Sequence, residues 1–129
     1  MLKIIIPIAP RTKKNSQRIV NIKIKGTNKY RPIIMPSELY KQYEKDCKKY
    51  LPKLKEPINE KVNVKCLYYM PTRRRCDLNN LLEASTDMLV HHKILEDDNY
   101  SIVNSHDGSR VYYDKENPRC EIYIEKIDY

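Results

Sequence analysis

The 129-residue sequence contains no tryptophan and no phenylalanine, and it has only two glycines. No apolar run approaches the roughly 20 residues that a membrane-spanning helix needs. The apolar stretch at the N-terminus is too short, and too interrupted by proline, for a signal peptide. We therefore expect a cytoplasmic protein without a membrane partner. The length suits a single domain over residues 1–129.

The sequence also lacks the cysteine and histidine patterns of zinc sites. Four cysteines are present, but no two form a C-x-x-C pair, and the three histidines have no zinc-motif spacing to them. A zinc site and a disulfide framework are therefore both disfavoured. Cys66 and Cys120 alternate with apolar residues in strand-like segments, which predicts small core residues.

Positive charge and tyrosine are what the sequence has in abundance. Lys and Arg number 25 against 17 Asp and Glu, a formal net charge of +8. This excess favours polyanionic partners, because each neutralised phosphate releases counterions, although a scattered positive surface is the alternative. Of the 11 tyrosines, we expect most to close the core and some to stack on unpaired bases.

Alternation of apolar and polar residues predicts strands at residues 2–8, 61–69 and 119–127. Residues 19–25 and 30–35 flank Gly26-Thr27-Asn28 and predict a hairpin, with Pro32 placing its second strand at an edge. Short strands are expected at 99–105 and 109–113, around the turn signal Asp107-Gly108. In the predicted strand at 61–69, the residues Val62, Val64, Cys66 and Tyr68 share one face.

Helical spacing predicts two helices, at residues 38–51 with Ser37 as N-cap and at about 77–92. The resulting order is approximately βββαβαββ. We therefore predict an α+β fold, a mixed or antiparallel sheet packed with two main helices.

The helix at 77–92 separates apolar from polar residues. At 100° per residue, the apolar side is formed by Leu78, Leu82, Ser85 and Leu89, with Leu81 and Met88 at its edge. The other side carries a row of oxygen ligands: Asp77, Asn80, Glu83 and Asp87. A solvated polar face, with Asp77 only as a cap, is the simpler interpretation.

An acidic turn and a basic loop flank this helix. Glu96-Asp97-Asp98 follows it, and three adjacent acids repel one another unless a cation lies near. Arg73-Arg74-Arg75 precedes it. Oxygen ligands without Cys or His suit Mg²⁺ or Mn²⁺. Phosphodiester hydrolysis needs such a metal ion and also cations that hold the backbone, so the segment predicts a site for phosphodiester chemistry.

The stretch from Arg73 to Ala84, with Asp87-Met88-Leu89 and Leu95 to Asp98 after it, resembles the RusA family of crossover junction endodeoxyribonucleases. The family pattern is approximately R-R-x-D-x-D-N-L-x-K, then D-A-L, then a turn with paired acids. The resemblance implies a RusA-like endonuclease domain that acts as a homodimer. Such a dimer binds four-way (Holliday) DNA junctions and makes paired nicks with Mg²⁺. The resemblance implies no small-molecule cofactor. The family is often carried by phages and prophages.

The resemblance maps family motif residues onto Asp77, Asn80, Asp87, Asp97 and Asp98. Together with the charge pattern of the segment, it leads us to expect the following roles. The catalytic set is Asp77, Asn79, Glu83 and Asp98; the metal ligands are Asp77, Asp97 and Asp98. Asn80 and Asp87 would complete or orient the ligand set. Contacts to phosphates are assigned to Lys13, Lys14, Arg73, Arg74 and Arg75.

Two residues depart from the family pattern. Asn79 replaces the second aspartate, which removes a charge and should weaken metal binding, and Glu83 replaces the lysine. Because Asn79 and Glu83 are i,i+4 neighbours, we hypothesise that Glu83 supplies the missing carboxylate. The alternative is a junction- or DNA-binding protein with weak or no nuclease activity. A basic structural protein, whose acids form internal salt bridges, is a further rival.

Overall fold

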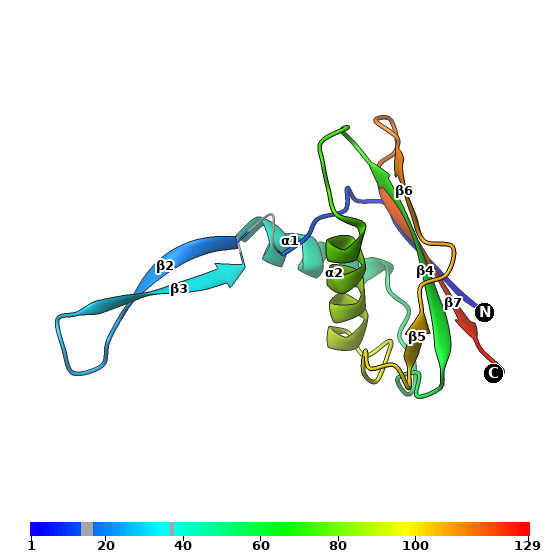
Figure 1. Cartoon of the computed structure of the whole chain (residues 1–129), viewed down its shortest axis with the longest axis horizontal. Helices are drawn as coiled ribbons and strands as arrows, with labels where there is room; N and C mark the ends of the chain where they lie inside the picture. Colours follow the sequence, from blue (N-terminus) through cyan, green and yellow to red (C-terminus); the bar gives the residue numbers. More distant parts are fainter. Residues whose placement is uncertain (14–16, 37) are drawn as a thin grey trace.

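The protein consists of a twisted sheet with two helices against one face and a β-hairpin that projects from this body (Figure 1). The computed structural model describes residues 1–13, 17–36 and 38–129, with the backbone alone at residues 17, 18 and 34–36. The predicted N-cap Ser37 lies outside the described residues. In chain order the elements are β1 (Leu2–Ile6), β2 (Gln17–Lys23), β3 (Tyr30–Pro36), α1 (Glu38–Cys47), the 3-10 turn η2 (Lys48–Tyr50), β4 (Val62–Met70), α2 (Leu78–His91), β5 (Val103–Ser105), β6 (Arg110–Tyr113) and β7 (Arg119–Lys126).

The main sheet is mixed, as predicted. Its order is β1-β7-β4, with β5 and β6 both on the free edge of β4. β7 is antiparallel to β1 and to β4, whereas β5 and β6 run parallel to β4. The α+β class is confirmed, and the structure has one more strand after α2 than the predicted order contained.

The turn at Asp107-Gly108 does not join a hairpin. Asn63 of β4 accepts hydrogen bonds at Oδ1 from the Asp107 amide (2.7 Å) and the Ser105 hydroxyl (2.6 Å). Its Nδ2 donates to the Asp107 carbonyl (3.1 Å). Because this turn is anchored to β4, β5 and β6 both pair with β4 and not with each other. Gly108 has φ +87°, a conformation that glycine adopts without a Cβ clash.

One face of the sheet is buried against the helices. On β4, Val62, Val64, Cys66 and Tyr68 are all buried, which confirms the predicted face. The prediction of core roles for Cys66 and Cys120 is also confirmed. The Tyr68 hydroxyl lies 2.7 Å from Ser85 Oγ, a buried hydrogen bond that joins the sheet to α2.

The buried face of α2 is rotated from the predicted one. Leu81 and Met88, predicted at its edge, are 1% and 3% exposed. Leu78 and Leu82 are only half-buried. The small side chain of Ser85 allows α2 to lie close to the sheet at Tyr68, and this contact turns the Leu81 side inward. The predicted row of polar residues remains on the opposite side of the helix.

Most tyrosines lie outside the core, so the prediction that they close it is wrong. Of the tyrosines, only Tyr40 and Tyr68 are buried. On the sheet face away from the helices, Tyr69 stacks on Tyr112 with ring centroids 5.0 Å apart. The Arg119 guanidinium lies 3.6 Å from the centroid of the Tyr69 ring. These rings are half-exposed because their polar ends and cationic neighbours suit a wet surface.

The β2–β3 hairpin is a separate two-stranded sheet whose contacts with the body are few. Both of its strands are edges, in agreement with the position predicted for Pro32. In the described parts of the chain, none of the helices has the length and apolarity to span a bilayer.

Candidate active site

Asp77 lies at the N-cap of α2 with its carboxylate exposed. Its backbone is extended (φ −78°, ψ 127°), and its side chain makes no cap hydrogen bond. Instead, Asn80 Nδ2 donates weakly to Asp77 Oδ2 at 3.4 Å. Because neither carboxylate oxygen is used to cap the helix, the exposed carboxylate is accessible to a ligand. Asn79, in the first turn, is also exposed.

A second part of the site follows along the same side of α2. Asn80, Glu83 and Asp87 line a small hollow together with Lys13. The Lys13 ammonium lies 3.2 Å from Asp87 Oδ2. Lys13, predicted to contact phosphate, therefore neutralises an acid of the helix in this structure. Lys14, its predicted companion, lies outside the described residues.

The acidic turn forms a third part. Asp97 Oδ1 accepts a hydrogen bond from the Asp98 amide at 2.7 Å, and Asp97 Oδ2 accepts one from Asn99 Nδ2 at 3.2 Å. The Asp98 amide chiefly lowers the pKa of the Asp97 carboxyl. Partial desolvation raises the pKa of Asp98, and the neighbouring Asp97 and Asp87 add to that rise. Asp98 is thus within electrostatic reach of the last polar residue of the α2 row.

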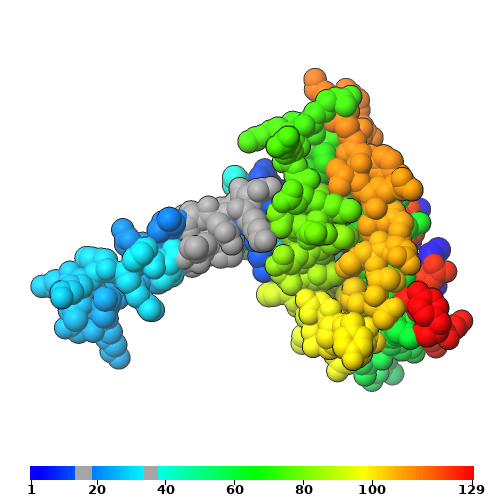
Figure 2. All heavy atoms as spheres, viewed as in Figure 1, coloured from blue at the N-terminus to red at the C-terminus, as the bar shows by residue number. Residues whose placement is uncertain are grey.

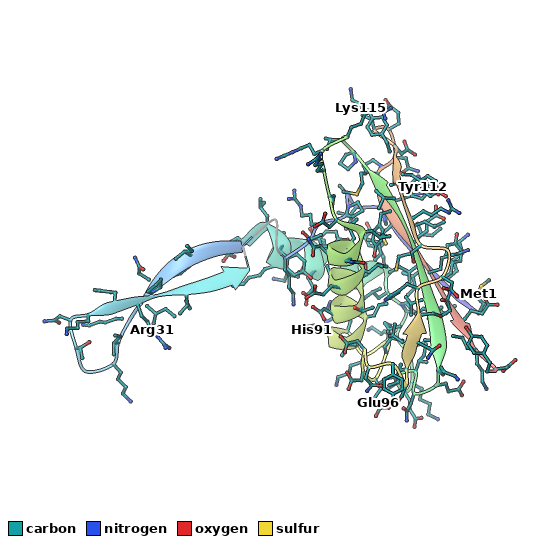
Figure 3. All side chains as sticks on the ribbon, viewed as in Figure 1. Met1, Arg31, His91, Glu96, Tyr112 and Lys115 are labelled. Carbon is teal, nitrogen blue, oxygen red and sulfur yellow. The ribbon has the colours of Figure 1, made fainter. Side chains whose placement is uncertain are left out.

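Within one chain, Asp77 and the acidic turn lie towards opposite ends of α2. The helix has 14 residues, which at 1.5 Å per residue is about 21 Å. Figure 3 shows Glu96 below the C-terminal end of α2, near His91. A metal ion needs its ligand oxygens within about 2.0–2.6 Å. In the described part of the chain, no group of three His, Cys, Asp or Glu side chains can hold a metal ion.

The loop that contains Arg73-Arg74-Arg75 (the arginine loop) forms one wall of an open hollow of about 460 Å³. Arg74 and Arg75 line it, together with Arg11 from the segment after β1. All three are exposed, and the hollow ends at Cys76, the residue before Asp77. Arg73 instead lies over the Tyr113 ring, 4.2 Å from its centroid. The hollow is suited to phosphate, because guanidinium groups bind it in a bidentate manner.

Sequence reasoning did not assign a role to Arg11. The local sequence carries no signal that the segment after β1 meets the arginine loop. The two segments are about 60 positions apart in the sequence, and they meet because β1 and β4 both pair with β7.

A helix that presents carboxylates beside an arginine-lined hollow, on a basic α+β body, defines a class of protein that handles phosphate backbones. A family model described as Endodeoxyribonuclease RusA matches residues 7–125 of the chain. The chain therefore belongs to the RusA endodeoxyribonuclease family, which indicates a hydrolase that cleaves DNA. A search of curated proteins gave no match.

Proposed function

We propose that this protein is a Mg²⁺-dependent endodeoxyribonuclease that resolves four-way DNA junctions by paired nicks, as a homodimer in the cytoplasm. The single observation that carries the proposal is the RusA family match over residues 7–125. The arginine-lined hollow, which ends at the residue before Asp77, supports it, because cations that can hold a phosphate then lie close in the chain to a candidate metal ligand.

The side chains available as metal ligands fit a hard divalent cation. Asp77 and Asn79 offer oxygens at one end of α2, while Asp97 and Asp98 offer carboxylates beyond the other. A bound Mg²⁺ supplies an activated water and stabilises developing charge on the phosphate. Arg74 and Arg75 would hold the DNA backbone, and Asn80 and Asp87 would orient the ligands.

A dimer can bring together the two acidic groups that are separated within one chain. If two copies pair with their α2 helices antiparallel about a two-fold axis, Asp77 of one subunit lies beside Asp98 of the partner subunit. Each such dimer contains two equivalent composite sites. Two symmetric nicks need two such sites, so the proposed geometry accounts for the separation seen in one chain.

The role of Glu83 affects whether the proposed site can cleave DNA. It lies on the same side of α2 as Asn80 and Asp87 and is exposed. In that position a carboxylate can move toward the Asn79 turn, since i and i+4 residues are neighbours on a helix. If Glu83 does not supply the carboxylate missing at position 79, the alternative is a junction-binding protein with little or no nuclease activity.

The test is incubation of the purified protein with a synthetic four-way junction and with a linear duplex of equal length, with and without Mg²⁺. We expect paired nicks in the junction only with Mg²⁺, and tighter binding to the junction than to the duplex. Junction binding without nicking at any Mg²⁺ or Mn²⁺ concentration would favour the binding-protein alternative. No preference for the junction would contradict the proposal and favour a structural role.

A further inference from the structure

The β2–β3 hairpin holds most of the net charge of the molecule. Residues 17–36 contain five Lys and Arg and no Asp or Glu. Of the 25 cations, 20 therefore remain for the rest of the chain, against all 17 acids. The hairpin thus carries +5 of the total of +8. A segment with one sign of charge and no internal counter-charge is suited to a polyanion.

The cations of the hairpin are available to a ligand. Lys23, Lys25, Lys29 and Arg31 are all exposed. In the described part of the chain, no carboxylate pairs with any of them. Arg119 in the body, by contrast, is held by Asp114 and Glu121. The hairpin charge is therefore not used in holding the fold together.

The hairpin also has a defined shape. Its tip is closed by hydrogen bonds from the Ile24 amide to the Lys29 carbonyl (2.9 Å) and from the Thr27 amide to the Ile24 carbonyl (3.1 Å). Gly26 takes φ +79° at this turn, which a residue with a Cβ rarely adopts. The seven residues of each strand extend about 24 Å, and Figure 2 shows the hairpin standing away from the body.

Apolar side chains on the hairpin are exposed as well. Ile19 is 73% and Tyr30 is 63% exposed. A two-stranded ribbon alone is of marginal stability in water, so a bound surface would stabilise it. The major groove of duplex DNA admits a two-stranded β-ribbon. There the cations meet phosphates, and apolar side chains can contact sugars and thymine methyl groups.

We propose that the β2–β3 hairpin is a DNA-holding arm that lies in a groove of duplex DNA away from the cleaved phosphate. This inference rests on the proposed function only in taking DNA as the substrate. It does not depend on which carboxylates bind the metal ion. A second copy of the chain is a less favourable binding partner for the arm, because the rest of the chain without the hairpin also has a positive net charge.

The first test compares two variants with the same loss of charge. The arm variant carries Lys23→Gln, Lys25→Gln, Lys29→Gln and Arg31→Gln. The control carries Lys45→Gln, Lys49→Gln, Lys53→Gln and Lys55→Gln, which alter exposed residues of the body. Binding of each to a linear duplex and to a four-way junction is measured from 50 to 200 mM salt.

We expect the arm variant to reduce the salt slope (log K against log [salt]) by about 2 to 4 units, since each lost phosphate contact removes about 0.9. The control should change the slope by less than about one unit. Equal losses in both variants would overturn the proposal, because net charge alone would then explain them. Circular dichroism checks that both variants fold.

A second test identifies what the arm touches. A photo-crosslinking amino acid replaces Asn28 at the exposed tip, and the adduct formed on a junction complex is analysed. An adduct with DNA supports the arm. An adduct with a second subunit, together with conversion of the arm variant to monomers, would assign the hairpin to the dimer interface and overturn the proposal.

Cleavage separates this inference from the proposed function. With enough protein to saturate the DNA, single-turnover nicking by the arm variant should stay within about threefold of the unmodified protein, because the arm lies away from the cleaved phosphate. A loss of nicking at saturation would contradict the assignment of the arm to holding DNA. If the unmodified protein does not nick at all, the proposed function fails, while the salt slopes and the crosslink still test the arm.

Discussion

Asp77 is the residue whose surroundings point most clearly to ligand binding. Its position would allow an ordinary helix cap, yet its side chain makes no cap bond, and the arginine-lined hollow begins one residue before it. A carboxylate that is not required by the helix can be replaced by an amide without large loss of stability. Its replacement therefore reports on chemistry more than on folding.

Asp77→Asn should lower the rate of Mg²⁺-dependent nicking by at least about 100-fold, since even residues that only support metal ligands contribute 10–100-fold. Binding to the junction should stay within a few fold. The measurement is single-turnover cleavage beside an electrophoretic binding assay. Asp128→Asn, at an exposed position near the C-terminus, is the control of equal charge. Undiminished nicking by the Asp77 variant would show that another group holds the metal.

Glu83 and Asn79 give a reciprocal test. If Glu83 supplies the carboxylate missing at position 79, Glu83→Gln should raise the Mg²⁺ concentration needed for half-maximal cleavage several fold, because the site loses a charge. Adding Asn79→Asp to that variant should return this Mg²⁺ concentration to the value of the unmodified protein. Glu56→Gln, at an exposed position, serves as control. Normal Mg²⁺ dependence in the Glu83 variant would exclude the compensation.

At the scale of elements, the edge of β4 shows how one side chain can hold the connection between two strands. Asn63 was predicted only as part of an alternating strand, on the side away from the core. Its amide in fact binds the turn between β5 and β6 at three points. The turn signal was recognised correctly, but its partner was not, because that partner lies more than 40 residues earlier in the chain.

Asn63→Ala should lower the free energy of unfolding by about 0.5–1.5 kcal/mol, because the hydrogen bonds to Ser105 and to the exposed backbone of Asp107 are lost. Chemical denaturation with urea measures the change. Asn59→Ala, at an exposed position, should have little effect. A variant as stable as the unmodified protein would mean that water replaces these hydrogen bonds at no cost.

Element boundaries were largely predictable. The hairpin, β4, α2 and β7 all lie within a few residues of their predicted ranges, because each has strong periodicity or a clear turn. α1 ends at Cys47, and the last predicted turn is 3-10. The rotation of α2 was not predictable, since it depends on the fit between Ser85 and Tyr68, and periodicity alone does not distinguish adjacent faces.

At the scale of the whole molecule, the proposed composite site predicts how mixed dimers behave. Asp77→Asn and Asp98→Asn should each be inactive alone. In a mixed dimer of the two, one composite site would contain both substitutions, and the other would contain neither. We therefore expect mixing to recover nicking of one strand per junction.

The measurement is strand-specific labelling of the junction after the two variants are refolded together. A mixture with either variant and unmodified protein controls for exchange of subunits. If each site were instead built within one chain, the mixed dimer would have no intact site and would remain inactive. Recovery of nicking would thus place the dimer interface along α2.

The sequence by itself determined the features that depend on near neighbours: the buried face of β4, the polar row of α2, the core cysteines and the motif from Arg73 to Asp98. Periods of two and 3.6 residues are local properties, and side chains a few positions apart share a face whatever the rest of the chain does. Only the tertiary structure decided which distant segments meet. It brought Arg11 to the arginine loop and Lys13 to Asp87. It also separated Asp77 from Asp98, because the length of a packed helix holds its two ends apart.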